Sequence, residues 1–544
     1  MSVDLSKITN SFGAAKSKDS VVGIGATATR TTAQAHPDKG IDPNDKHLCT
    51  DYLLTNLKGR TISGAFITIA AQGVQFVLSL ASIMVLARLL TPKDFGLFAM
   101  VTSVIGYLRV FKDAGLSTAT VQREGITHAQ VSNLFWINVA VSGAISLIFA
   151  AGSPIVAWFY REPRLVPITL VLSSTFILSG LTVQHTALLN RQMRFKALAL
   201  IQVSSLLIGV AVGIGMAWLK YSYWALVWGN LATMVATAGL TWLAIPWRPQ
   251  APSRQSGTRS LVAFGANLAT GGFIYSLAKG ADAMLIGRFY GADSVGLYTR
   301  AAALLNRPMD QFLSPIGSVF LPVLSRVQTQ RERYRRTFLQ VYEAMVLASF
   351  LSMGLLFALA RPLTLVVLGP KWEQAALIFA GLTMAALSIP PGTASTWLFA
   401  SQGRGKDWLF GSSLVSAIAL ASFVAGLPFG PAGVAIVYSA AGLLVGMPVL
   451  YYFAGREGPV TTGDLWIGIV RYLPLWAVVC GTTYSMRLLL ASSAPLVQLV
   501  VCAPVGLVAG LILIWVLTPM RRTALGLVDI LRELKSRRVS SDRS

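Results

Sequence analysis

The chain has 544 residues, of which 54% are hydrophobic and 12% are charged, and its formal net charge at pH 7 is +23. Soluble domains carry about 25% charged residues, so this composition excludes a soluble globular protein. The Lys and Arg residues lie mainly in short gaps between apolar runs, which is typical of membrane-protein loops and argues against nucleic-acid binding.

Residues 1–60 lack the apolar core of a signal peptide and are rich in Ser, Thr, Gly and Ala, so we expect a disordered cytoplasmic tail. Beyond this tail, apolar runs of about 20 residues recur, and a helix of that length spans a bilayer. The polar, proline-containing stretch 247–260 interrupts them, and we expect it to be a cytoplasmic linker. The six spans predicted before this linker cover 62–87, 95–118, 131–153, 165–187, 197–219 and 223–246.

Eight further spans are predicted after the linker, and they cover 261–286, 294–320, 338–360, 375–399, 408–427, 431–453, 466–488 and 495–518. A basic stretch, 519–544, closes the chain, and we expect a cytoplasmic tail there. The predicted fold class is therefore an all-α polytopic membrane protein with about 14 transmembrane helices. Lys and Arg are more frequent in the loops on the N-terminal side of the membrane, which predicts that both termini are cytoplasmic.

Two stretches of sequence repeat along the chain at a nearly constant offset. VLARLLTPKDFGLF (85–98) aligns without a gap with LIGRFYGADSVGLY (285–298), at an offset of 200 residues. NRQMRFK (190–196) aligns with ASQGRGK (400–406), at an offset of 210 residues. Two matches in the same order predict that the chain arose by duplication.

The repeat also predicts how the spans are grouped. Six spans separate the paired positions, and because six is even, both copies face the same way across the membrane. We therefore expect two six-helix bundles, 61–246 and 261–453, related by a pseudo-two-fold axis along the membrane normal. Residues 454–518 would form transmembrane helices 13 and 14 outside the repeat.

Eight charged residues fall inside predicted spans two, seven and eight. A charge at the bilayer centre costs about 2.5–3.5 kcal/mol on insertion scales, so such residues usually face a cavity or a partner. The bases are Arg109, Lys112, Lys279, Arg300 and Arg307, and the acids are Asp113, Asp282 and Asp310.

The spacing of these charges allows two interpretations. Arg109–Asp113, Lys279–Asp282 and Arg307–Asp310 are spaced for pairing along one helix, so the charges could merely neutralise one another between packed helices. Alternatively, the bases line a cationic cavity, since Arg300 and Arg307 lie two turns apart on one helix face. Such a cavity suits an anionic ligand such as a pyrophosphate or an acidic sugar, and the acids would orient the arginines or bind a coupling cation.

The sequence contains none of the common catalytic or metal-binding patterns. Its three cysteines have no paired spacing, and neither an HExxH pattern nor a GxxxxGK[ST] phosphate loop occurs. The longest predicted outer loop, RPLTLVVLGPKWEQ (361–374), is too short and too poor in acids for a catalytic carboxylate set. We therefore expect a transporter rather than an enzyme, with no cofactor and no metal site.

The repeated stretches and their neighbours resemble a known family. ARLLTPKDFGLFAM, FKDAGLSTATVQRE, LLNRQMRFK, IGRFYGADSVGLYTRA and LFASQGRGK are similar in order and spacing to the polysaccharide-transporter (Wzx-type) flippases, closest to the colanic-acid and succinoglycan exporter branch. Asp113 and Gly115 match the F-x-D-x-G-L motif of that family, and Arg191, Arg194 and Phe195 match its inner-loop motif. The resemblance implies the multidrug/oligosaccharidyl-lipid/polysaccharide exporter fold.

The resemblance further implies a flippase of the bacterial inner membrane. Such a protein moves undecaprenyl-pyrophosphate-linked oligosaccharide repeat units across the membrane by alternating access, for exopolysaccharide or O-antigen synthesis. The implied partners are this lipid-linked oligosaccharide, membrane lipids, a coupling ion (proton or sodium), and a polymerase and a chain-length regulator of the same pathway. The alternatives are a peptidoglycan lipid-precursor flippase or a multidrug/cation antiporter of the same superfamily and, from another class, a membrane glycosyltransferase or polymerase.

Overall fold

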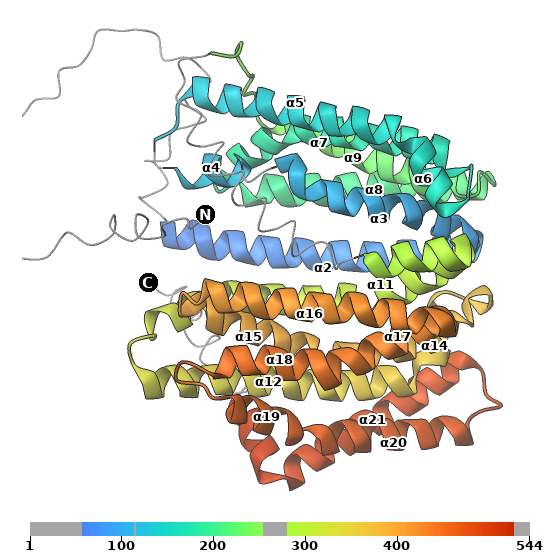
Figure 1. The fold of residues 1–544 in the computed structure, drawn as a ribbon, viewed down its shortest axis with the longest axis vertical. Coiled ribbons are helices and arrows are strands. Elements are labelled where there is room, and N and C mark those ends of the chain that lie inside the picture. Colours follow the sequence, from blue (N-terminus) through green and yellow to red (C-terminus); the bar gives the residue numbers. More distant parts are fainter. Residues whose placement is uncertain (1–56, 114–115, 124, 254–279, 527–544) are drawn as a thin grey trace, which may run out of the picture. The chain divides into compact units, whose positions relative to one another are not determined.

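A computed structural model describes residues 57–113, 116–123, 125–253 and 280–526 (Figure 1). Within these ranges the chain is helical and contains no strand, as predicted. Most of the expected tails 1–60 and 519–544, most of the seventh predicted span and part of the linker lie outside the described residues.

The first half of the chain forms long helices where the spans are predicted, and two short helices between them. The long helices are α2 (Leu57–Leu89), α3 (Pro92–Asp113), α5 (His128–Ala151), α7 (Leu165–Arg191), α8 (Phe195–Trp218) and α9 (Trp224–Ala244), and the short ones are α4 (Leu116–Gln122) and α6 (Ser153–Tyr160). Helix α5 begins where Thr127 forms a capping box with Gln130, whose backbone N–H donates to the Thr127 hydroxyl.

The second half repeats this alternation of long and short helices. It comprises α11 (Ala281–Arg326), α12 (Arg331–Ala358), α13 (Ala360–Val367), η3 (Pro370–Trp372), α14 (Ala375–Ala386), α15 (Ile389–Ser401), α16 (Gly405–Gly426), η4 (Leu427–Phe429), α17 (Gly430–Ala441), the π-helical segment η5 (Gly442–Gly446), α18 (Met447–Gly455), α19 (Thr462–Val470), α20 (Leu473–Leu489) and α21 (Pro495–Val516). The predicted outer loop 361–374 therefore folds largely as α13 and η3.

Ten helical stretches in the described part are long and apolar enough to cross a membrane. One of them, Gly405–Gly455, is 51 residues long and contains a turn at η4, after which α17 packs back against α16. Helices α3 and α11, which carry the charges predicted to lie within the membrane, are not among the ten.

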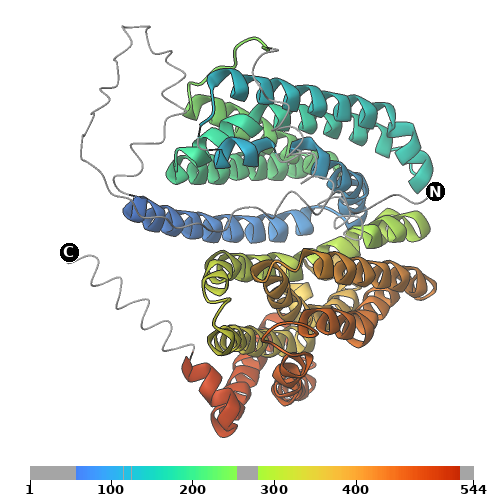
Figure 2. The same cartoon turned by 60° about the vertical axis from the view of Figure 1, so that its left-hand side comes forward.

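The helices of each half pack chiefly against one another. Helices α5 and α9 pack against α7, and α8 packs against α9 and α2, so that these helices run side by side in both views (Figures 1 and 2). In the second half, α14 packs against α11, α12 and α17, and α20 packs against α12 and α21. The main contact between the halves is that of α3 with α11.

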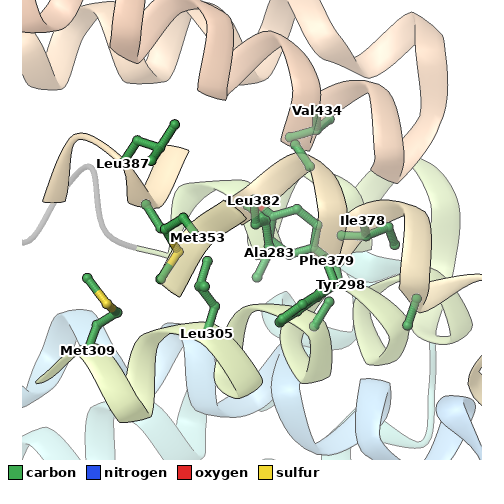
Figure 3. Close-up of a cluster of buried hydrophobic side chains, with 14 of the residues drawn as sticks. Ala283, Tyr298, Leu305, Met309, Met353, Ile378, Phe379, Leu382, Leu387 and Val434 are labelled. Carbon is green, nitrogen blue, oxygen red and sulfur yellow. The ribbon is translucent and has the colours of Figure 1, made fainter. Parts of the chain in front are cut away.

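Helix α11 has two differently composed faces. Tyr298, Leu305 and Met309 are buried, and Figure 3 shows them beside Met353 of α12 and Leu382 of α14. Arg300 and Arg307 each follow such a buried residue by two positions, which is about 200° around a helix. The arginines therefore lie on the face of α11 that is turned away from α14.

The break between the predicted seventh and eighth spans is only one residue long. Within α11, Gly291 alone has non-helical dihedral angles, with φ 77° and ψ −175°. The positive φ is readily accessible only to glycine. The stretch between the predicted spans 261–286 and 294–320 is thus mostly helical.

Candidate functional site: the contact between α3 and α11

Helices α3 and α11 cross at two glycines that are equivalent in the repeat. A Cβ atom added at Gly96 would lie 1.6 Å from the carbonyl oxygen of Ala292, and one added at Gly296 would lie 1.8 Å from that of Pro92. The two backbones are therefore in direct contact. Ala292 and Gly296 match Pro92 and Gly96 at the offset of 200, so the two contacts are reciprocal. Two-fold-related helices produce this pattern, which supports the predicted duplication.

Residues preceding α3 bind the second half of the chain. The Arg88 guanidinium donates to the carbonyl oxygen of Val366 at 3.1 Å, and the Lys371 ammonium donates to the carbonyl oxygen of Arg88 at 3.3 Å. The buried Trp372 donates its indole N–H to the carbonyl oxygen of Ala87 at 2.9 Å. Helix α2 is thus tied to the segment that contains α13 and η3.

The equivalent residues of α11 also contact the first half, but through aromatic rings. The guanidinium of Arg288, the counterpart of Arg88, lies 5.8 Å from the centre of the Phe159 ring in α6. Gly287, the counterpart of Ala87, packs against the ring of Tyr160, where an added Cβ atom would lie 2.6 Å from Cε1. We call the end of the helices that holds these contacts the Gly96 end, and the end that holds residues 190–196 and their repeat 400–406 the Arg194 end.

Arg300 faces α3, and its guanidinium lies over an aromatic ring of that helix. Its guanidinium lies 4.9 Å from the centre of the Phe95 ring, and Phe95 in turn packs edge-on against Trp372 at 5.3 Å. The Nε atom of Arg300 is buried and has no hydrogen-bond partner among the described residues. The contact with Phe95 is a cation–π interaction, so within the described part of the chain the guanidinium keeps hydrogen-bonding capacity for another group.

Arg307 lies two turns further along the same face of α11 and faces α2. It borders a cavity of ≈ 20 Å³ together with Phe76, Ser79 and Leu80 of α2. Its side chain is exposed rather than enclosed. The two arginines predicted to share a face therefore both lie along the line where α11 meets α2 and α3.

Asp282 occupies a different environment. It lies in the first turn of α11, where its Oδ1 accepts a hydrogen bond from the backbone N–H of Ala283 at 2.8 Å. The hydroxyls of Tyr298 and Tyr107 are its polar neighbours. This carboxylate therefore lies at the start of a helix beside two tyrosines.

The structure describes the other predicted site residues less fully. Arg109, Lys112 and Asp113 lie in the last two turns of α3, and Asp310 lies one turn beyond Arg307 in α11. The side chains of these four residues lie outside the described part, and Lys279 lies outside it altogether. Whether the eight charges share one cavity therefore stays a prediction.

The arginines of the predicted inner-loop motif hold backbone carbonyls. Arg191 is buried and donates to the carbonyl oxygens of Thr120 at 3.0 Å and Arg123 at 2.5 Å, which fixes the end of α4. Arg194 donates to the carbonyl oxygen of Ala244, the last residue of α9, at 2.9 Å. These residues position helices at the Arg194 end.

The second copy of this motif has the same geometry and additional bonds. Arg404 donates to the carbonyl oxygen of Ala454 at 2.9 Å, which is the Arg194–Ala244 bond shifted by 210 residues. The preceding residues, Met193 and Gly403, both have a left-handed backbone, with φ 53° and 69°. Arg404 also binds the carbonyl oxygens of Phe453 and Glu457 and the carboxylate of Asp407, which accepts a second bond from Arg456.

Ion pairs and a hydrogen bond join α12 to the segment that contains α19, α20 and α21. Glu343 accepts hydrogen bonds from Arg471 at 2.9 Å and from the Thr523 hydroxyl at 3.0 Å. Arg335 forms a two-pronged ion pair with Asp464, with N–O distances of 2.6 and 3.0 Å. These charges are matched within the protein, and they connect the segment outside the repeat to the second half.

The fold is that of known membrane transporters. It is similar to a solved structure of the lipid II flippase MurJ in an inward closed conformation, with a TM-score of 0.65, 15% identity and coverage of 83% of this chain and 98% of that chain. It is also similar to an inward-facing multidrug resistance MATE family transporter of the MOP superfamily, with a TM-score of 0.55, 14% identity and coverage of 75% and 98%. At such identities the likeness concerns the fold.

The chain belongs to the family described as polysaccharide biosynthesis protein, whose sequence model matches residues 85–377. It is 25% identical over 328 residues to the teichuronic acid biosynthesis protein TuaB of Bacillus subtilis (strain 168), covering 60% of this chain and 66% of that protein. It is 23% identical over 325 residues to the lipopolysaccharide biosynthesis protein WzxC of Escherichia coli (strain K12), covering 59% and 65%. The matches thus span just under two thirds of these relatives.

A third relative fits the exporter branch named from the sequence. The chain is 25% identical over 354 residues to the succinoglycan biosynthesis transport protein ExoT of Rhizobium meliloti (strain 1021), covering 64% of this chain and 71% of that protein. The resemblance to polysaccharide transporters is therefore confirmed. The family match also includes both copies of the repeat that form the α3–α11 contact.

Proposed function

We propose that this chain translocates an undecaprenyl-pyrophosphate-linked oligosaccharide across the bacterial inner membrane by alternating access. The observation that carries the proposal is Arg300, a cationic side chain at the contact between the two halves of a polysaccharide-family protein. Its guanidinium packs on the ring of Phe95, and its buried Nε atom has no hydrogen-bond partner among the described residues. A pyrophosphate offers the oxygen pairs that an arginine fork binds.

The topology we propose has fourteen spans with both termini in the cytoplasm. The ten apolar stretches supply eleven spans, because Gly405–Gly455 contains two. Helix α3, the part of α11 after Gly291, and the span predicted at 261–286 complete the set. In this orientation the Gly96 end faces the periplasm, and the contacts between the halves there close the path on that side.

In the transport cycle we propose, the cationic residues bind the substrate on one side of the membrane, and it is released on the other. With the Arg194 end open, Arg300 and Arg307 bind the pyrophosphate, together with Arg109, Lys112 and Lys279. The α3–α11 contact then opens at the Gly96 end and releases the substrate outward. Asp113, Asp282 and Asp310 orient these bases or bind a coupling proton or sodium ion. A polymerase and a chain-length regulator would act on the released repeat unit.

Deletion of the gene in the source strain tests this function. Lipid-linked intermediates and surface polysaccharide are then measured by mass spectrometry. We expect a complete lipid-linked repeat unit to accumulate while surface polymer is lost. A normal polymer profile would overturn the proposal. Rescue of a strain depleted of its essential peptidoglycan precursor flippase would instead favour that alternative substrate.

A further inference from the structure

Two cavities lie on helices that are equivalent in the repeat. The first, of ≈ 600 Å³, lies between α4, α7 and the first residue of α8. The second, of ≈ 280 Å³, lies between α15, α16 and the π-helical segment with its flanking helices α17 and α18. Helices α7 and α15 end in the two copies of the motif that Arg194 and Arg404 fix in the same geometry.

The same face of the equivalent helices lines each cavity. On α7 the lining positions include Ser179, Thr182, Val183 and Thr186, and on α15 they include Ile389, Gly392, Thr393 and Thr396. Each of these four pairs is separated by 210 residues, which is also the offset between Arg194 and Arg404 and their equivalent hydrogen bonds. Two cavities at one register indicate a feature that both halves share rather than a single packing defect.

The lining of the α15 cavity is neutral and combines hydroxyl groups and aromatic rings with aliphatic side chains such as Ile389 and Leu450. The described residues that line it include Ser412 and Ser416 of α16, Tyr438 of α17 and the indole of Trp408, and none of them is charged. The described lining of the α7 cavity is likewise free of charged side chains. An anionic pyrophosphate would find no counter-charge there.

The hydroxyls of α15 are oriented as hydrogen-bond acceptors. Thr393 donates its hydroxyl proton to the carbonyl oxygen of Ile389 at 2.9 Å, and Thr396 donates to that of Thr393 at 2.7 Å. Ser388 donates to Ala385 at 2.6 Å. A hydroxyl bonded in this way keeps lone pairs for an incoming donor. The suitable ligand therefore carries O–H groups of its own and an apolar ring face for Trp408, which is the chemistry of a neutral sugar.

We infer that the α15 cavity binds a neutral sugar unit of the transported oligosaccharide, and that the α7 cavity is its equivalent in the first half. The inference rests on the proposed function, and it assigns sugar recognition to residues other than the arginines that hold the pyrophosphate. A volume of ≈ 280 Å³ is close to the lower limit of about 300 Å³ for small-ligand sites. It therefore suits one sugar ring and excludes the whole lipid-linked molecule.

Binding measurements on the purified protein in lipid nanodiscs test the inference. The two probes are undecaprenyl pyrophosphate and the lipid-linked oligosaccharide pool extracted from the deletion strain. Their affinities are compared for the wild type, for the double variant Thr393→Val and Thr396→Val, and for Thr482→Val. Thr482 is the matched control, because it is also half-buried and its hydroxyl donates to the carbonyl oxygen one turn earlier, that of Val478 at 2.8 Å in α20.

We expect the wild type to bind the lipid-linked oligosaccharide at least tenfold more tightly than the bare carrier. The double variant loses most of this preference but binds the carrier normally, and Thr482→Val behaves like the wild type. Three results would overturn the sugar site. The double variant could keep the wild-type preference for the lipid-linked oligosaccharide, Thr482→Val could lose as much of that preference as the double variant, or the wild type could show no preference. Failure of the wild type to bind either probe would instead contradict the proposed function.

Discussion

Arg300 shows how a single residue links the fold to its proposed task. A buried charge without a full set of partners destabilises a protein, and a cation–π contact returns only about 2 kcal/mol even when desolvated. The ring of Phe95 therefore offsets part of the cost of burying the Arg300 guanidinium. The remaining hydrogen-bonding capacity is available to a ligand, which is why we assign this residue to the pyrophosphate.

Replacing Arg300 should separate stability from transport. Arg300→Met keeps an unbranched apolar stem beside Phe95 and removes the charge, so we expect an unchanged or higher melting temperature in detergent. Polymer export at matched expression should fall at least tenfold, because the anionic group loses its partner. Export at the wild-type level would show that Arg300 does not contact the substrate. Arg361→Met is the control, since Arg361 forms an exposed ion pair with Glu373 at 2.6 Å.

Among the elements, α3 and α11 depend on backbone contact at Gly96 and Gly296. Gly96→Ala places a Cβ atom 1.6 Å from the carbonyl oxygen of Ala292, so the two helices must move apart. We expect lower stability and at least a tenfold loss of export. Gly106→Ala in the same helix meets no atom within 4 Å, and it should be neutral or stabilising by about 0.5–1 kcal/mol. Equal export by the two variants would contradict a close helix contact.

At the Arg194 end, we predict that the hydrogen bonds of Arg404 stabilise the second half more than those of Arg194 stabilise the first. Arg404 binds three carbonyl oxygens and Asp407, whereas Arg194 binds the carbonyl oxygen of Ala244. Each hydrogen bond contributes about 1 kcal/mol, so Arg404→Ala should lower the melting temperature several times more than Arg194→Ala. The measurement is thermal unfolding in one detergent. An equal or reversed order would refute the comparison.

The sequence predicts elements well where periodicity and repetition are strong. The offset of 200 paired Gly96 with Gly296, and the structure places both glycines at the helix crossing. The offset of 210 paired Arg194 with Arg404, and both residues hold the same kind of carbonyl. The conformation of the connecting segments was predicted less well, because the end of an apolar run does not show where the helix ends. The expected loop 361–374 is therefore largely helical and buries Trp372.

Contacts between residues far apart in the chain could not be predicted from the sequence. A helical pattern indicates which face a residue occupies, but not which helix will cover that face. The position of Arg300 was predicted, whereas its partner Phe95 was not, because the two are brought together only when α3 meets α11. The tyrosine neighbours of Asp282 were likewise not predicted, and its expected pair with Lys279 lies outside the described residues.

For the whole molecule, the α3–α11 contact is where the two halves would separate during transport. Arg88 and Lys371 are exposed at the Gly96 end, where the Lys371 ammonium lies 3.3 Å from the Arg88 carbonyl oxygen. In a background without Cys49, Cys480 and Cys502, we expect a short bis-maleimide to bridge Arg88→Cys and Lys371→Cys and to stop export. The same reagent should leave each single-cysteine variant active. Continued export by the bridged protein would show that this end need not open.

Translocation in proteoliposomes tests the central claim most directly. The purified chain is reconstituted with the lipid-linked oligosaccharide pool from the deletion strain, and the fraction of sugar accessible to membrane-impermeant periodate is followed with time. We predict that the wild type makes the protected fraction accessible under an imposed ion gradient, and that Arg300→Met and the bridged Arg88→Cys/Lys371→Cys protein do not. Liposomes containing the wild type that expose sugar no faster than protein-free liposomes would contradict the account.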